Sequence, residues 1–309
     1  MTSQFPLLRL PRLALFAVFK ALSIGEKIML SLCSKKTAIQ INNDRLYSQK
    51  VIVSLDMFNQ GIRVHTKNYN DKFDIFIYPD TWSSDISNTQ QFYISCCITG
   101  INTFWKNQQE GFLSFISHLL KMFRCKITTT FSCCDSDSFQ QTILMFFDLQ
   151  LEFKTLCILF DGSKYQNLWN QISSNLGLVE DLQIFFDNMN SGFTPVFTSW
   201  PTKEISIFGC NWFTLESLLS CTCSSITLEE SRLGNKDLDE ILRKWMTGGF
   251  PNLKYLRIQR LRRTDDGEHI LGMDWRDLNG MVIQSNDGSK KATINIGSGG
   301  IEISVTPFE

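Results

Sequence analysis

Apolar residues dominate the beginning of the chain, where FPLLRLPRLALFAVFKALSIGEKIMLSLCSKK spans residues 5–36. Their spacing is that of one wide helix face, followed by a second helix. The first face is formed by Leu15, Phe16, Val18, Phe19 and Leu22. Ser23 and Glu26 have the S-x-x-E spacing of a capping box, which predicts that the second helix begins there, and Lys35 and Lys36 would close it. A unit of about 40 residues cannot bury this much apolar surface by itself, so the pattern predicts a partner.

The next part of the chain has the alternating pattern of strands. The runs are VIVSLDMF, GIRVHT, KFDIFIYP and FYISCCITG, within residues 51–105, and turn-forming residues separate them. Residues 110–126, EGFLSFISHLLKMFRCK, change to helical spacing. His118 falls beside the apolar face of this helix. Because no acidic or nucleophilic partner stands at a matching spacing, a position at the helix surface or core edge is favoured over a catalytic one.

From residue 151 onward a rough repeat appears. Its strand candidates start about 20 to 30 residues apart. They are FKTLCILF (153–160), VEDLQIFF (179–186), KEISIFGC (203–210), SSITLEES (224–231) and LKYLRIQR (253–260). Helix candidates at residues 168–176, 214–221 and 235–247 lie between them. This texture is typical of leucine-rich-repeat-like strand-helix units, with parallel strands on one face and helices on the other.

Length and composition agree with a folded protein of more than one domain. The chain has 309 residues, of which 43% are hydrophobic and 20% charged. We expect three parts: a helical module at 5–47, a mixed strand and helix region at 51–150, and the repeat-like domain at 151–309. The fold class is therefore α+β or α/β. A net charge of -1 gives no indication of nucleic acid or of an acidic membrane surface as a partner.

The ten cysteines do not form a metal or disulfide pattern. Two pairs are vicinal, no C-x-x-C occurs, and none of the three histidines lies at ligand spacing to a cysteine or another histidine. We therefore expect reduced cysteines in a cytoplasmic or nuclear protein. A secretory signal is disfavoured because the stretch LALFAVF holds only seven residues before Lys20.

The opening stretch resembles the F-box, the helical module by which substrate receptors bind the Skp-type adaptor of cullin-RING ubiquitin ligases. The residues that carry this resemblance are the pair Leu10-Pro11, the apolar helix, the capped second helix and the Ser-Lys-Lys ending. FPLL-x-LP followed by S-x-x-E-K-I is similar in particular to the nematode F-box proteins with a type 2 F-box-associated domain. In place of an acidic pair after Leu10-Pro11, this chain has Arg12, Leu13 and Ala14. The resemblance implies adaptor binding through Leu10, Pro11, Leu15, Phe16, Phe19, Leu22, Ile24 and Ile28.

A second resemblance, about 200 residues later, points to the same group. It is to the F-box-associated domain, and it is carried by Asn211-Trp212, Leu218-Leu219, Asp237-Leu238-Asp239, Trp245, Pro251, Leu253, Leu256 and Ile258. Two motifs in the right order imply a substrate-recognition subunit of a Skp-cullin-F-box ligase. Its partners would be the adaptor, through it a cullin scaffold, and a protein substrate.

The sequence gives no indication of catalytic chemistry. It lacks the nucleotide-binding, zinc-protease and nucleophile-elbow motifs, so we expect neither an enzyme nor a bound cofactor or metal. The glycines of Gly297-Ser298-Gly299-Gly300 separate two strand candidates and predict a hairpin turn rather than a phosphate cradle.

Four arginines form the densest positive patch in the sequence. They are Arg257, Arg260, Arg262 and Arg263. Such a patch is usually a solvent-exposed face. The alternative is a substrate-binding surface for an acidic or phosphorylated segment.

Two other functions stay open. One is a protein-interaction module without a role in a ligase. The other is a hydrolase-like enzyme whose apolar N-terminus is a core helix, which would require a pocket with convergent titratable groups.

Overall fold

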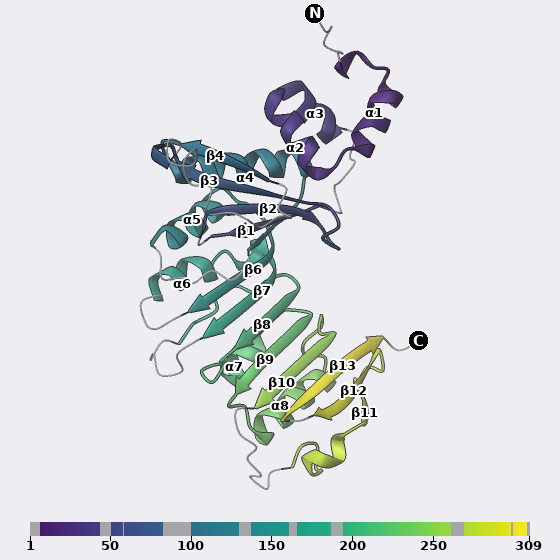
Figure 1. The fold of residues 1–309 in the computed structure, drawn as a ribbon. Helices are drawn as coiled ribbons and strands as arrows, with labels where there is room; N and C mark the ends of the chain where they lie inside the picture. The colour runs from purple at the N-terminus through teal and green to yellow at the C-terminus, as the bar shows by residue number, and fades with distance from the viewer. Residues whose placement is uncertain are drawn as a thin grey trace, which may run out of the picture. The chain divides into compact units, whose positions relative to one another are not determined.

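The computed structural model describes residues 7–43, 51–57, 59–82, 100–129, 137–160, 166–186, 194–260, 269–297 and 299–307 (Figure 1). The strand candidate FYISCCITG, except for its last residue Gly100, lies outside these ranges, as do the vicinal cysteines, Arg262 and Arg263. The chain divides into two compact units, Met1–Thr130 and Phe131–Glu309.

The first unit begins with short helices. A 3-10 turn at Leu7–Arg9 is followed by α1 (Arg12–Ala21), α2 (Ile24–Cys33) and α3 (Lys35–Asn43). The predicted capping box is confirmed, since the Glu26 amide donates to Ser23 Oγ over 3.2 Å and the Ser23 amide donates to Glu26 Oε2 over 2.8 Å.

One expected boundary was wrong. Lys35 and Lys36 do not close the second helix but open α3, because Ser34 takes an extended conformation. The Ser34 hydroxyl accepts from the Thr37 amide over 3.4 Å, so this residue separates two helices.

A sheet in the first unit has the strand order β5-β1-β2-β3-β4. The strands are β1 (Val51–Asp56), β2 (Gly61–Thr66), β3 (Lys72–Pro79), β4 (Gly100–Trp105) and β5 (Ile127–Thr129). Helix α4 (Gln108–Phe123) contacts β1, β3 and β4 with its buried apolar residues, as its helical spacing predicted. Val53, Val64 and Phe73 are neighbours across β1, β2 and β3, and all three are buried. The alternate positions of the same strands are mostly polar.

The helical module packs on this sheet. Helix α2 contacts β3, and α3 contacts α4. The Ile24 amide donates to Asp71 Oδ2 over 2.9 Å, and a Cβ at Gly25 would lie 2.3 Å from the Phe73 ring. The absence of a side chain at Gly25 therefore allows α2 to approach β3 closely.

The second unit contains the predicted strand-helix units. Its sheet has the order β11-β12-β13-β10-β9-β8-β7-β6, and β6 to β10 are parallel. All five predicted strands are confirmed as β6 (Phe153–Phe160), β7 (Val179–Phe186), β8 (Glu204–Phe208), β9 (Ser225–Ser231) and β10 (Tyr255–Arg260). The predicted helices are α6 (Gln166–Ser173), α7 (Leu215–Ser220) and α8 (Asn235–Met246). The helix α5 (Asp137–Asp148) precedes β6.

The sheet ends in an antiparallel extension. It consists of β11 (Val282–Gln284), β12 (Lys290–Gly297) and β13 (Gly300–Pro307), and β13 pairs with β10. Gly297 pairs with Gly300, so the predicted hairpin turn is confirmed. The fold thus combines N-terminal helices with mixed sheet and interspersed helices, the expected α/β character.

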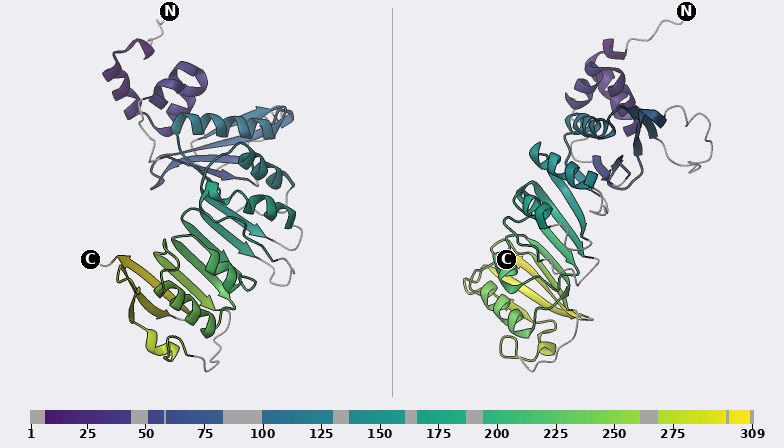
Figure 2. Two further views of the ribbon diagram at one scale, coloured as in Figure 1. Left: turned by 180° about the vertical axis from the view of Figure 1, so that it is seen from behind. Right: turned by 90° about the vertical axis from the view of Figure 1, so that its left-hand side faces the viewer.

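The repeat has a simple physical basis in two buried rows that cross the parallel strands. One row is Leu156, Leu182, Ile205, Ile226 and Leu256, and the next is Ile158, Ile184, Ile207, Leu228 and Ile258. The helices of this unit lie along one side of its sheet, as the side view in Figure 2 shows. Trp169 of α6, for example, meets the Phe160 ring edge-on at 5.7 Å. We call the opposite side of this sheet the open face.

Candidate functional site

The helical module carries several exposed apolar side chains. Leu13 is 85% exposed and Phe16 is 38% exposed, both on α1. Leu8, Met29, Leu32 and Ile39 are exposed as well. A small soluble unit rarely leaves this many large apolar groups in water unless another surface covers them.

The predicted adaptor-binding residues fall into two groups. Leu15, Phe19, Ile24 and Ile28 are buried within the first unit. Pro11 and Phe16 are exposed, while Leu10 and Leu22 are half-buried. Leu13, Met29, Leu32 and Ile39 were not among the predicted adaptor contacts, because helical spacing alone does not tell which apolar face turns inward.

Lys27, in the first turn of α2, is buried. Its ammonium group donates to the Leu22 carbonyl, and Asp71 and Glu26 attract it. Loss of solvation outweighs this attraction and lowers the pKa of Lys27 to about 8. The ammonium group therefore bonds to the backbone just before α2, while the Ile24 amide provides the hydrogen bond from α2 to Asp71.

His118 has a structural contact at the edge of the core. Ser31 Oγ donates to the Ile28 carbonyl over 2.6 Å, and His118 Nε2 lies 2.8 Å from the same hydroxyl oxygen. This contact joins α4 to α2. Burial, with a smaller effect of Lys121, lowers the pKa of His118, so the imidazole is held neutral.

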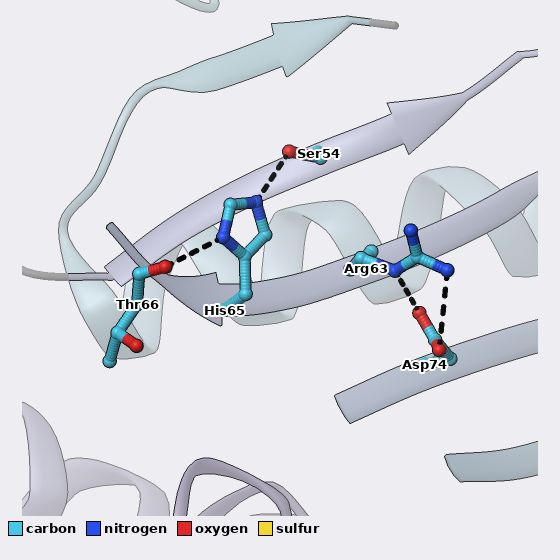
Figure 3. A network of polar contacts seen from close by, with 5 residues as sticks. All are labelled: Ser54, Arg63, His65, Thr66 and Asp74. Carbon is cyan, nitrogen blue, oxygen red and sulfur yellow. Dashed lines mark hydrogen bonds and ion pairs between the residues drawn. The ribbon is translucent and has the colours of Figure 1, made fainter. Parts of the chain in front are cut away.

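A cavity of about 510 Å³ lies over β1, β2 and β3, and Gln108 at the start of α4 contributes to its lining. Arg63 Nε donates to Asp74 Oδ1 over 2.6 Å, which raises the pKa of Arg63 (Figure 3). Beside this pair, His65 Nε2 lies 2.9 Å from Ser54 Oγ, and His65 Nδ1 lies 2.8 Å from the Thr66 carbonyl. Sequence analysis could not find this group, because it depends on the pairing of β1, β2 and β3.

The groups around this cavity satisfy one another rather than form a catalytic constellation. Ser54 is only 7% exposed, and the contact of His65 Nδ1 is a backbone carbonyl instead of a carboxylate. Asp74, buried beside Arg63, neutralises the guanidinium. The titratable groups that converge on this cavity are therefore paired with one another and do not have the arrangement that a hydrolase would require.

The two described arginines of the predicted patch lie apart. Arg257 is on the open face, with Nε 3.6 Å from Glu302 Oε1 of β13. Arg260 Nη2 donates to Asn235 Oδ1 over 2.6 Å, at the start of α8. The structure therefore does not bring Arg257 and Arg260 together.

The open face of the second unit carries rows of partly exposed side chains. Asp181 of β7 stands directly beside Glu204 of β8. Burial first, and then Glu204 and Glu180, raise the pKa of Asp181. Farther along the same strands, the rings of Phe185 and Phe208 stack at 4.3 Å.

The part of the chain that the structure describes holds no group of three or more side chains suited to a metal ion. No helix within these ranges is long and apolar enough to cross a membrane. The six described cysteines are free thiols. Burial raises the pKa of Cys210 to about 12 and that of Cys157 to about 11, so both are inert thiols at neutral pH.

The repeat-like part is similar to a known family of binding domains. Residues 199–258, which run from before β8 to within β10, match the family described as F-box associated. This family is non-catalytic, and Trp212, Leu218 and Trp245 of the predicted motif lie within the match. The resemblance in this segment is confirmed, and the F-box resemblance of the N-terminal module stays a prediction.

Two proteins of Caenorhabditis elegans are distantly similar to the chain. It is 24% identical to "Skn-1 dependent zygotic transcript 15 protein" over 192 residues, which are 58% of this chain and 54% of that protein. It is 22% identical to "Uncharacterized protein F59B2.8" over 278 residues, which are 83% of this chain and 61% of that protein. The chain thus spans less than two thirds of the length of these relatives. No solved structure matches it.

Proposed function

We propose that this protein is a substrate-recognition subunit of a Skp-cullin-F-box ubiquitin ligase. The N-terminal module would bind a Skp-type adaptor, and the second unit would hold a target protein for ubiquitylation by the partner subunits. The observation that carries the proposal is the exposed apolar surface of a capped helical module in a chain that also matches the F-box-associated family. Because the cysteines that the structure describes are free thiols, the receptor would work in the cytoplasm or nucleus.

Of the adaptor contacts that the resemblance implies, Pro11 and Phe16 are exposed. Leu13 is not one of those residues, and we add it because it is 85% exposed on α1, three residues before Phe16. Leu15, Phe19, Ile24 and Ile28 would support this surface from beneath, since they hold the helices in place. Arg257 and its neighbours on the open face would belong to the recruiting surface of the second unit.

A pull-down with a purified Skp-type adaptor tests the proposal. We expect the full chain to be captured, and Leu13→Asp or Phe16→Asp to abolish capture because a buried carboxylate at an apolar interface lacks a partner. Val196→Asp is the matched control, since Val196 is 65% exposed in the second unit.

Point substitutions are preferable to removal of residues 1–47. Removal would uncover Phe73 and His118, which α2 contacts, and would alter the first unit itself. If the folded wild-type chain fails to bind the adaptor, or if Leu13→Asp and Phe16→Asp bind as well as Val196→Asp, the adaptor role is wrong and a simple interaction module remains.

A further inference from the structure

The open face has an unfavourable pair of charges near the start of β7 and β8. Asp181 and Glu204 are direct neighbours on parallel strands, whose backbones lie about 4.8 Å apart. Like charges in this position destabilise a sheet. Ser206 Oγ donates to Glu204 Oε1 over 3.3 Å, which keeps that carboxylate on the open face.

Nearby cations do not cancel this negative charge. Lys154 and Lys203 lower the pKa of Asp181 less than Glu204 and Glu180 raise it. Lys203 is also paired elsewhere, since its Nζ lies 2.6 Å from Glu180 Oε2. The arginine on the face, Arg257, is near Glu302. The surface around Asp181 and Glu204 is therefore complementary to a cation.

An apolar strip lies on the same face. The rings of Phe185 and Phe208 are parallel within 2° and only half-buried, and Leu159 is the neighbour of Phe185 on β6. Four residues along a strand separate Asp181 from Phe185, a distance of about 13 Å. An occupant of both regions would need basic and apolar groups at about that spacing.

We infer that the open face binds a basic protein segment with an apolar or aromatic anchor. Its ammonium or guanidinium groups lie against Asp181 and Glu204, and its anchor covers Phe185 and Phe208. That this segment belongs to the ubiquitylation target rests on the proposed function; its binding to the face does not. The acidic or phosphorylated segment suggested by the arginine patch would meet repulsion at Asp181 and Glu204.

Random short peptides displayed on phage and selected on the immobilised full chain test this inference. We expect the enriched pool to carry a net positive charge and an apolar residue. A labelled peptide from that pool should bind about tenfold more weakly to Asp181→Asn/Glu204→Gln, because two attractive charges are lost. Phe185→Ala should also weaken binding, and added salt should weaken it for the wild type.

Glu180→Gln is the matched control, because Glu180 lies on the same strand but faces Lys203 rather than the open face. Enrichment of acidic or neutral peptides, no enrichment at all, or equal binding by the double variant would each overturn the inference. Capture by the adaptor is measured separately on the same proteins. Its failure with intact peptide binding would refute the ligase role alone.

Discussion

Lys27 places an ammonium group in the interior of the first unit, where it is costly to keep charged. Because its pKa is about 8 in the folded protein and 10.5 in the unfolded reference, the folded state binds fewer protons between these two values. Its contribution to the free energy of unfolding therefore rises with pH through that window.

Lys27→Met should remove this dependence on pH. We expect the variant to be more stable than the wild type at pH 7, by on the order of 1 kcal/mol, and this advantage to shrink toward pH 10. Thermal unfolding of both proteins across this pH range is the measurement, with the exposed Lys20→Met as control. If the difference in stability between Lys27→Met and the wild type did not change with pH, the lowered pKa of a buried Lys27 would be contradicted.

Asp181, on the open face, makes the free energy of unfolding depend on pH in the opposite direction to Lys27. Its raised pKa means that the folded state holds more protons than the unfolded state above the ordinary value, so the free energy of unfolding falls as pH rises through the raised pKa. Asp181→Asn should raise the melting temperature at pH 7, and the gain should vanish near pH 3, where the carboxyl is protonated in both states. A lower melting temperature at pH 7 would show that Asp181 stabilises the sheet.

At the scale of elements, the contact between α2 and β3 depends on one glycine. Gly25→Ala would place a Cβ 2.3 Å from the Phe73 ring, so either the ring or the helix must shift. We expect a loss of about 1–3 kcal/mol in the free energy of unfolding. Gly177→Ala, where nothing lies within 4 Å of the added Cβ, is the control in chemical denaturation. Equal stability of the two variants would refute the close contact.

The repeat was predictable because each of its strands carries its own pattern. In Leu253, Leu256 and Ile258 the apolar residues recur as L-x-x-L-x-I, and all three are buried. The capping box at Ser23 was predictable for the same reason, since it depends only on residues three apart. The start of α3 was missed because two lysines favour the end of a helix. The extended Ser34, whose hydroxyl accepts from the Thr37 amide, instead starts a new helix at Lys35.

The candidate surfaces were less predictable, because they depend on which elements meet. Both faces of α1 and α2 are apolar in sequence. Only the packing of α2 against α3 and β3 distinguishes Ile28, which is buried, from Met29, which is exposed. The separation of Arg257 from Arg260 could have been predicted from the sequence, because residues three apart in a strand point to opposite faces.

At the scale of the whole molecule, each unit has one proposed binding role. The first unit presents Leu13 and Phe16, and the second presents an open face with charged and aromatic rows. The match to the F-box-associated family falls entirely in the second unit. The proposed adaptor binding by the first unit therefore needs a direct measurement.

Titration calorimetry of the purified chain with a Skp-type adaptor, at several temperatures, measures this claim most directly. The account predicts binding with a negative heat-capacity change, because apolar surface is buried, and its loss in Leu13→Asp/Phe16→Asp but not in Val196→Asp. Absence of binding by the folded wild-type chain, or equal affinity of the double variant, would contradict it.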